Sequence, residues 1–187
     1  MPRPSREIVP GGAYHVFARG SNRGSIFAFD GDRIDFLDCL RRAFERHEVR
    51  CLAYCLMPNH YHLLVETPDE RLSYAMKELN GRHALRFNRR YQRDAHLFKN
   101  RFSAVLQESG DQLIATLRYT ARNPVEAGLC SDPAEWPWSS SRALAGLDAP
   151  PAFLDARRVL SYLADEPEAA MAAYRDLVAA PAHPIGV

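Results

Sequence analysis

The order of strand-like and helix-like segments is the feature that most narrowly limits how this chain of 187 residues can fold. Short alternating stretches bounded by Gly, Pro or Asn predict strands, whereas apolar residues three and four apart predict helices. These patterns predict strands at 13–19, 49–56, 60–66 and 98–107, and helices at about 30–47, 70–92 and 111–123. The order β-α-β-β-α-β-α contains the split β-α-β plan. We therefore predict an α+β fold, a ferredoxin-like antiparallel sheet with its helices on one face.

Two of the predicted helices carry further local signals. The first should begin near Asp30 or Asp32 and bury one apolar face, made of Ile34, Leu37, Leu40 and Phe44. The third should stop before Pro124, because proline disfavours continuation of a helix.

The length suits one compact domain with a short extension. We expect a principal domain at 1–132 and a C-terminal helical appendage at 133–187, with helices at about 154–164 and 167–179. No apolar run approaches the roughly 18 residues that cross a bilayer. The first ten residues are polar rather than signal-like, so we expect a cytoplasmic protein without a membrane partner.

Basic residues gather in the first part of the chain. The net charge is +1, yet residues 1–103 carry 18 Lys and Arg against 12 Asp and Glu. Four arginines recur at helical spacing, with Arg90 adjacent and with few acidic partners expected nearby: Arg82, Arg86, Arg89 and Arg93. This pattern favours contact with nucleic-acid phosphates, and the alternative is a solvated charged face. Arg19 and Arg23, beside glycines, and the segment Arg3–Arg6 are further candidates.

His60 and His62 are two residues apart in a predicted strand. Alternate residues of a strand share a face, so both imidazoles can converge on one divalent cation, while Tyr61 faces the core. Two imidazoles leave most of the coordination sphere open, which suits catalysis more than structure. On spacing alone, two unrelated surface or core histidines are the alternative.

Tyr119 and Asn123 are four residues apart, so they stack on one face of the third predicted helix. Leu113, Leu117 and Ala121 mark a different, buried face of the same helix. An amide oxygen such as that of Asn123 can complete a hard-metal site with two imidazoles. A packing role is the alternative for Tyr119.

Taken in order along the chain, these residues resemble a known family. The match runs over about residues 8–145 and consists of Met57-Pro58-Asn59-His60-Tyr61-His62-Leu63-Leu64, Arg101-Phe102, Arg118-Tyr119, Asn123-Pro124-Val125, Ala127-Gly128-Leu129 and Trp136-Pro137-Trp138-Ser139-Ser140. It is similar to the REP-associated tyrosine transposases, which belong to the HUH-type single-tyrosine transposases of single-strand insertion sequences.

The resemblance implies a role for each matching residue. Tyr119 would be the nucleophile, and the ligands of a divalent metal, Mg²⁺ or Mn²⁺, would be His60, His62 and Asn123. The substrate would be single-stranded DNA with hairpins, cleaved and rejoined through a 5′-phosphotyrosine. Residues 1–132 would then form the catalytic domain. Further contacts to DNA are expected from Arg101, Arg118 and Arg122.

Three other functions remain open on the sequence. The same active site would serve a domesticated nickase for repeat processing, replication or mobilisation. A non-catalytic nucleic-acid-binding module can use the same fold, although such sheets present aromatic residues where this chain has His60 and His62. A metal hydrolase that activates water would not need Tyr119. The oligomeric state, monomer or homodimer, is undecided.

Overall fold

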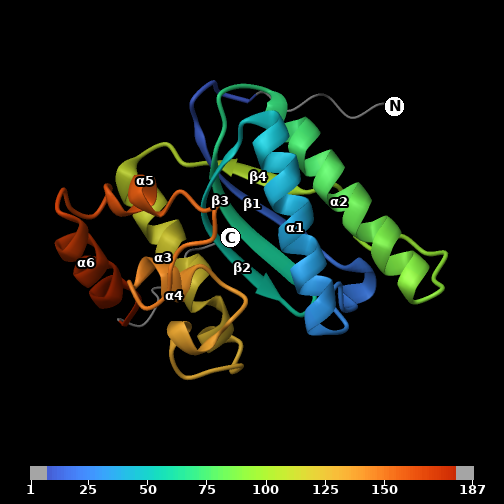
Figure 1. Ribbon diagram of the computed structural model, residues 1–187. Helices are drawn as coiled ribbons and strands as arrows, with labels where there is room; N and C mark the ends of the chain where they lie inside the picture. Colours follow the sequence, from blue (N-terminus) through green and yellow to red (C-terminus); the bar gives the residue numbers. More distant parts are fainter. Residues whose placement is uncertain (1–7, 180–187) are drawn as a thin grey trace.

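The computed structural model describes residues 8–179 and places a four-stranded antiparallel sheet at the centre of the molecule (Figure 1). Its strands are β1 (Ala13–Arg19), β2 (Arg50–Met57), β3 (His60–Glu66) and β4 (Ser103–Leu106). Their order across the sheet is β2-β3-β1-β4, as expected when two β-α-β units interleave. The predicted α+β, ferredoxin-like fold is therefore confirmed. β1 and β3 are central, so side chains on β3 lie in the middle of the sheet.

Helices α1 (Asp30–His47) and α2 (Arg71–Arg90) pack against each other on one face of this sheet (Figure 1). Phe36 and Leu40 of α1 are fully buried, and Tyr61 of β3 projects between the two helices to donate a hydrogen bond to Asn80 (2.8 Å). The expectation for Ile34 was wrong, because its side chain is 60% exposed. The buried face of α1 is rotated and runs through Phe36 instead, at the i+4 spacing to Leu40.

Helix α3 (Gly110–Glu126) covers the opposite face of the sheet, where it contacts β2 and β3. The expectation that all helices share one face was therefore wrong. The Ser109 side chain caps the first turn of α3, and Leu113 and Leu117 are buried as predicted. Pro124 lies inside the helix, so the predicted end at residue 123 was wrong. Proline removes only one bond near the C-terminus, and α3 ends at Glu126, just before Gly128 with its φ of 69°.

The edge strand is shorter than the predicted 98–107. Ser103 pairs with Phe17 of β1, whereas Phe98 pairs with Gly20. Between these two pairs, the edge segment has two more residues than β1, so it bulges away from the ladder. This bulge contains Asn100 and separates β4 from the bridge at Phe98.

The segment after residue 132 runs along the free edge of β2. It contains a 3₁₀ turn (Pro133–Glu135) and the helices α4 (Ser141–Leu144), α5 (Ala156–Leu160) and α6 (Pro167–Ala179). The helix predicted at about 154–164 is only one turn and a half, because residues 161–163 form turns. Main-chain bonds join Leu56 to Trp138 (2.8 Å), Tyr54 to Ser140 (2.9 Å) and Cys51 to Asp155 (2.8 Å). The boundary at residue 132 stays a prediction.

Among residues 8–179, no helix is both long enough and apolar enough to cross a membrane. The sequence expectation for Arg3–Arg6 concerns residues outside those that the structure describes.

Candidate active site

The two histidines of β3 lie on the face of the sheet that α3 covers. Tyr61, between them, points to the other face and is fully buried, as the alternation of a strand requires. The ring centroids of His60 and His62 are 4.9 Å apart, and the ring planes are perpendicular. The predicted convergence of the two imidazoles is therefore what the structure has.

Helix α3 brings Tyr119 and Asn123 to the same place. The Tyr119 ring lies edge-on to His62, with the centroids 5.3 Å apart. One turn later, Oδ1 of Asn123 lies 3.3 Å from Nε2 of His60. The buried residues Leu113 and Leu117 fix the rotation of α3 and thus turn its polar face toward the histidines. All four residues chosen from the sequence as nucleophile or ligand meet at one point.

Burial keeps the imidazoles of this site neutral near neutral pH. For His62, burial and then the neighbouring His15 and His60 hold the pKa well below its ordinary value. For His60, burial and the charge of Arg19 lower the pKa, and the hydrogen bond that the protonated ring would donate to Asn123 opposes them. Neutral imidazole is the form that offers a lone pair to a metal.

The hydrogen bonds around His60 determine which of its nitrogens carries the proton. Asn59 uses its Nδ2 to donate to the carbonyl oxygen of Arg23 (3.1 Å), and its Oδ1 lies 2.7 Å from Nδ1 of His60. Oδ1 can only accept, so Nδ1 of His60 carries the hydrogen. The lone pair of His60 Nε2 therefore points at Oδ1 of Asn123, which is also an acceptor.

Two electron-pair donors thus face each other without a hydrogen between them. Nε2 of His62 is buried and has no hydrogen-bond partner among the described residues. A divalent cation satisfies such a set of donors, and the amide oxygen is a ligand type that suits Mg²⁺ or Mn²⁺. Within residues 8–179, no cluster of three or more His, Cys, Asp or Glu is arranged to hold a metal.

A cavity of about 640 Å³ opens beside these residues. Its floor is the sheet, its wall is α3, and its rim is the bulged edge segment. Cationic side chains lie along it, namely Arg19, Lys99 and Arg101. The neutral imidazoles and the amide thus lie next to positively charged side chains. Such a cavity suits a substrate that carries phosphates.

The predicted DNA-binding arginines fall into separate groups. Arg19 and Arg101 line the cavity, and Arg23 is exposed in a 3₁₀ turn (Ser21–Arg23) close to the β2–β3 turn. Arg118 is half-buried on α3, next to Tyr119. Arg122, also on α3, pairs with Glu126 and donates to the carbonyl oxygen of Val178 (2.8 Å).

The arginines of α2 lie on the other side of the sheet. Arg82 pairs with Glu78, and Arg86 and Arg90 pair with acidic residues of α1, Asp35 and Asp32. The expectation that they have few acidic neighbours was wrong, because α1 supplies carboxylates from far away in sequence. The other two arginines predicted in this group have no carboxylate partner named above. Arg89 is exposed, and the Arg93 guanidinium lies over the Phe87 ring.

Sequence reasoning missed His15 and Phe17 of β1. Both share the face of His62, and Phe17 is the register partner of His62. His15 lies in a cluster of rings with His62 and Tyr119, and burial lowers the pKa of His15 to about 4. The alternation in residues 13–19 places His15 and Phe17 on one face, but it does not say which strand lies beside them.

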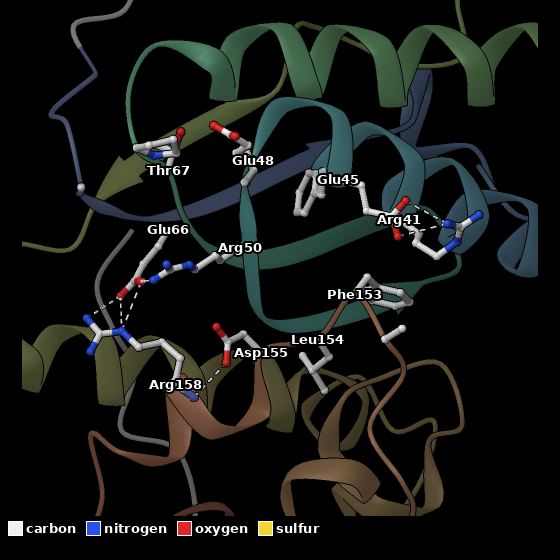
Figure 2. A pocket seen from close by; sticks show the side chains of 15 residues that line it. Arg41, Glu45, Glu48, Arg50, Glu66, Thr67, Phe153, Leu154, Asp155 and Arg158 are labelled. Carbon is white, nitrogen blue, oxygen red and sulfur yellow. Dashed lines mark hydrogen bonds and ion pairs between the residues drawn. The ribbon is translucent and has the colours of Figure 1, made fainter.

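A larger hollow, about 890 Å³, lies at the far edge of the sheet, between the end of α1 and residues 152–158 (Figure 2). Its charged side chains bind one another: Glu66 pairs with Arg50 and Arg158, and Arg41 pairs with Glu45. Tyr119 and the two histidines of β3 are absent from its lining. We therefore place the candidate active site in the smaller cavity.

The sequence places the chain in a family of transposases. The sequence model described as "Transposase IS200 like" matches residues 9–123, which is more than half of the chain and spans β1 to Asn123. The chain belongs to this family. DNA strand transfer is thus its class of reaction.

Two individual proteins refine the comparison. A protein of Haemophilus influenzae that carries the name REP-associated tyrosine transposase is 25% identical over 146 residues, which cover 72% of this chain and 82% of that protein. A solved structure of a REP-associated tyrosine transposase bound to a REP hairpin has 18% identity and a TM-score of 0.64. The aligned part covers 79% of this chain and 88% of that one, and it shows the same fold.

Proposed function

We propose that this protein cleaves and rejoins single-stranded DNA at repeat hairpins through a covalent bond to Tyr119, with a divalent metal held by His60, His62 and Asn123. One observation carries the proposal. Tyr119 lies against His62, while Oδ1 of Asn123 lies 3.3 Å from Nε2 of His60. A phenol beside a metal-fitting donor set is the arrangement that a tyrosine-dependent strand transfer needs.

Tyr119 would act through its hydroxyl oxygen. That oxygen attacks the scissile phosphorus, an O–P bond forms, and the bond from phosphorus to the 3′ oxygen breaks. The phenol loses its proton, the leaving 3′ oxygen gains one, and the 5′ end remains on the enzyme as a phosphotyrosine. His60, His62 and Asn123 would hold Mg²⁺ or Mn²⁺, which would supply a Lewis acid for the phosphate, in keeping with the family's general use of a divalent metal.

The reverse reaction would rejoin DNA. A 3′ hydroxyl that enters the cavity attacks the phosphotyrosine, and the Tyr119 oxygen leaves and regains a proton. No external energy source is required, because one phosphoester replaces another. The chain's own contribution is to hold the phenol, the histidines and the strand in one place.

A DNA hairpin is the substrate that the surroundings favour. Arg19, Lys99 and Arg101 line the cavity and offer positive charge to a strand. The fold is also that of a protein bound to a REP hairpin. We propose Arg23, Arg118 and Arg122 as neighbouring contacts. Contacts by Arg82, Arg86, Arg89 and Arg90 of α2, and by Arg93 just after it, stay a prediction.

The test is a search for the covalent intermediate. The full chain is mixed with labelled hairpin oligonucleotides taken from repeats beside its own gene, with Mn²⁺, and run on a denaturing gel. We expect a shifted band that a chelator, Tyr119→Phe or His60→Ala removes, whereas the matched control Tyr74→Phe on exposed α2 retains it.

Other outcomes would separate the alternatives. Metal-dependent cleavage without a band, unchanged in Tyr119→Phe, would show a nuclease that uses water. Tight hairpin binding without cleavage would show a binding module. In either case the proposed nucleophile is wrong.

A further inference from the structure

His15 of β1 takes part in the candidate site without being one of the proposed ligands. Its Nε2 lies 2.9 Å from Nδ1 of His62, and the two rings stack with their centroids 5.1 Å apart. The Tyr119 ring lies edge-on to His15 at 5.9 Å. His15 therefore contacts both the proposed nucleophile and a proposed ligand.

The bond between the two imidazoles has two possible forms. In one, Nδ1 of His62 carries the hydrogen and donates it to His15, which leaves a lone pair on Nε2 of His62. In the other, His15 donates, and Nε2 of His62 carries a hydrogen that blocks a metal. That Nε2 is buried, and among the described residues it has no hydrogen-bond acceptor, so the second form leaves its hydrogen unsatisfied.

We propose that His15 is a positioning residue, which accepts the Nδ1 hydrogen of His62 and so keeps Nε2 of His62 free to bind the metal. The inference rests on the proposed function, since it assumes that His62 is a ligand. It also accounts for the close approach of two imidazoles from β1 and β3. Metal-bound histidines generally donate their other ring hydrogen to an acceptor that fixes the ring, and here that acceptor is a second imidazole.

A parallel arrangement at His60 supports this assignment. There Asn59 Oδ1 accepts from Nδ1, and Nε2 points toward Asn123. Each of the two proposed histidine ligands thus has its Nδ1 within hydrogen-bond distance of a separate neighbour. His15 comes from β1 and Asn59 from the β2–β3 turn, so two elements orient the pair.

The experiment compares two substitutions in the full chain. His15→Phe keeps an aromatic ring in the cluster but removes the acceptor, whereas His15→Gln restores an acceptor oxygen on a flexible side chain. Affinity for Mn²⁺ alone is measured by the electron paramagnetic resonance signal of the free ion. Thermal unfolding without metal reports folding, and His62→Ala tests whether His62 binds the ion.

We expect His15→Phe to weaken Mn²⁺ binding by about 10 to 100-fold, and His15→Gln to restore most of it, with similar unfolding temperatures in the two variants. Equal Mn²⁺ affinity in His15→Phe and wild type, with a clear loss in His62→Ala, would overturn this inference and leave the proposed function standing. Equal losses in His15→Phe and His15→Gln would assign His15 a packing role. Mn²⁺ binding that is unaffected by His62→Ala would overturn the proposed metal site itself.

Discussion

At the scale of single residues, Asn59 joins two parts of the candidate site. Its Nδ2 donates to the carbonyl oxygen of Arg23, and its Oδ1 accepts from His60. One amide thus ties the loop after β1 to a proposed ligand. The two functions use different atoms, so substitutions can separate them.

We expect Asn59→Asp to keep Mn²⁺ affinity and Asn59→Leu to lose about 10 to 100-fold. Aspartate retains the acceptor oxygen opposite His60 but loses the donor to Arg23, and leucine loses both. Titration of each variant with Mn²⁺ measures the difference. An equal loss in both variants would mean that the bond to Arg23, rather than the orientation of His60, decides metal affinity.

The sequence was sufficient for the residues that act through spacing within one element. His60 and His62 share a face because they are two apart in a strand, and Tyr119 and Asn123 share one because they are four apart in a helix. The meeting of the two pairs depends on how α3 packs on the sheet, which the family resemblance supplied. His15 was missed because its role depends on the pairing of β1 with β3, a contact between distant segments.

At the scale of elements, the molecule has two cationic surfaces that are candidates for binding DNA. The bulge before β4 presents Lys99 and Arg101 to the cavity. Helix α2 presents Arg82 and Arg86 on the other side of the sheet, where Glu78 and Asp35 partly neutralise them. Removal of two charges from each surface makes a matched comparison.

We expect Lys99→Ala with Arg101→Ala to reduce the salt dependence of hairpin binding by about two in the slope of log K against log salt. Arg82→Ala with Arg86→Ala should change this slope less, because those guanidinium groups already bind carboxylates. Fluorescence anisotropy over a range of salt concentrations gives both slopes. The reverse ranking would place the DNA track on α2.

Asp32 holds the start of α1 to the end of α2. Its buried carboxylate accepts hydrogen bonds from the main-chain N–H groups of Ala28 and Phe29 and from the side chains of Tyr91 and Arg90. Burial by itself raises the pKa of this carboxyl, but the hydrogen bonds outweigh burial and leave the pKa below its ordinary value. The charged form therefore stabilises the fold.

We expect Asp32→Asn to lower the free energy of unfolding at pH 7 by about 1–3 kcal/mol, because an amide leaves some of these donors unsatisfied. A carboxyl with a depressed folded-state pKa contributes stability that is fully present above the unfolded pKa of about 3.9 and is lost as the pH falls through the folded pKa. Urea unfolding at pH 7 and at about pH 4 and pH 2.5 should therefore show a difference from wild type that holds down to about pH 4 and shrinks only below it. A constant difference would mean that ionisation of Asp32 is not involved.

The sequence predicted the strands and helices correctly where local patterns and tertiary packing agree. It predicted the wrong bounds where contacts between distant segments, or the position of a residue within its helix, determine where an element ends. The two-residue bulge shortened β4, although 98–107 reads as one strand. Pro124 was expected to end α3, yet the helix continues to Glu126, since a proline this close to the C-terminus removes only one helical bond.

At the scale of the whole molecule, the segment after residue 132 is built into the fold. Its main chain bonds to Tyr54 and Leu56 on the edge of β2, and α6 packs on α3. Arg122 of α3 donates a hydrogen bond to the carbonyl oxygen of Val178 in α6. This bond attaches the helix that carries the proposed nucleophile to α6. Composition and periodicity predicted an appendage. Neither pattern shows that a loop will form hydrogen bonds with the edge of a sheet, so this integration could not be predicted.

These contacts lead us to expect that a chain cut after residue 132 is insoluble or unfolds at a much lower temperature. It would expose the backbone edge of β2 together with the buried Tyr54, whose ring contacts Phe153. A chain cut after residue 164 removes α6 but retains the bonds to β2, so it should fold with a smaller loss. Circular dichroism during heating compares the three proteins. If the chain cut after residue 132 unfolds at the same temperature as the full chain, the principal domain ends at residue 132, as the sequence predicted, and the bonds along β2 contribute little to stability.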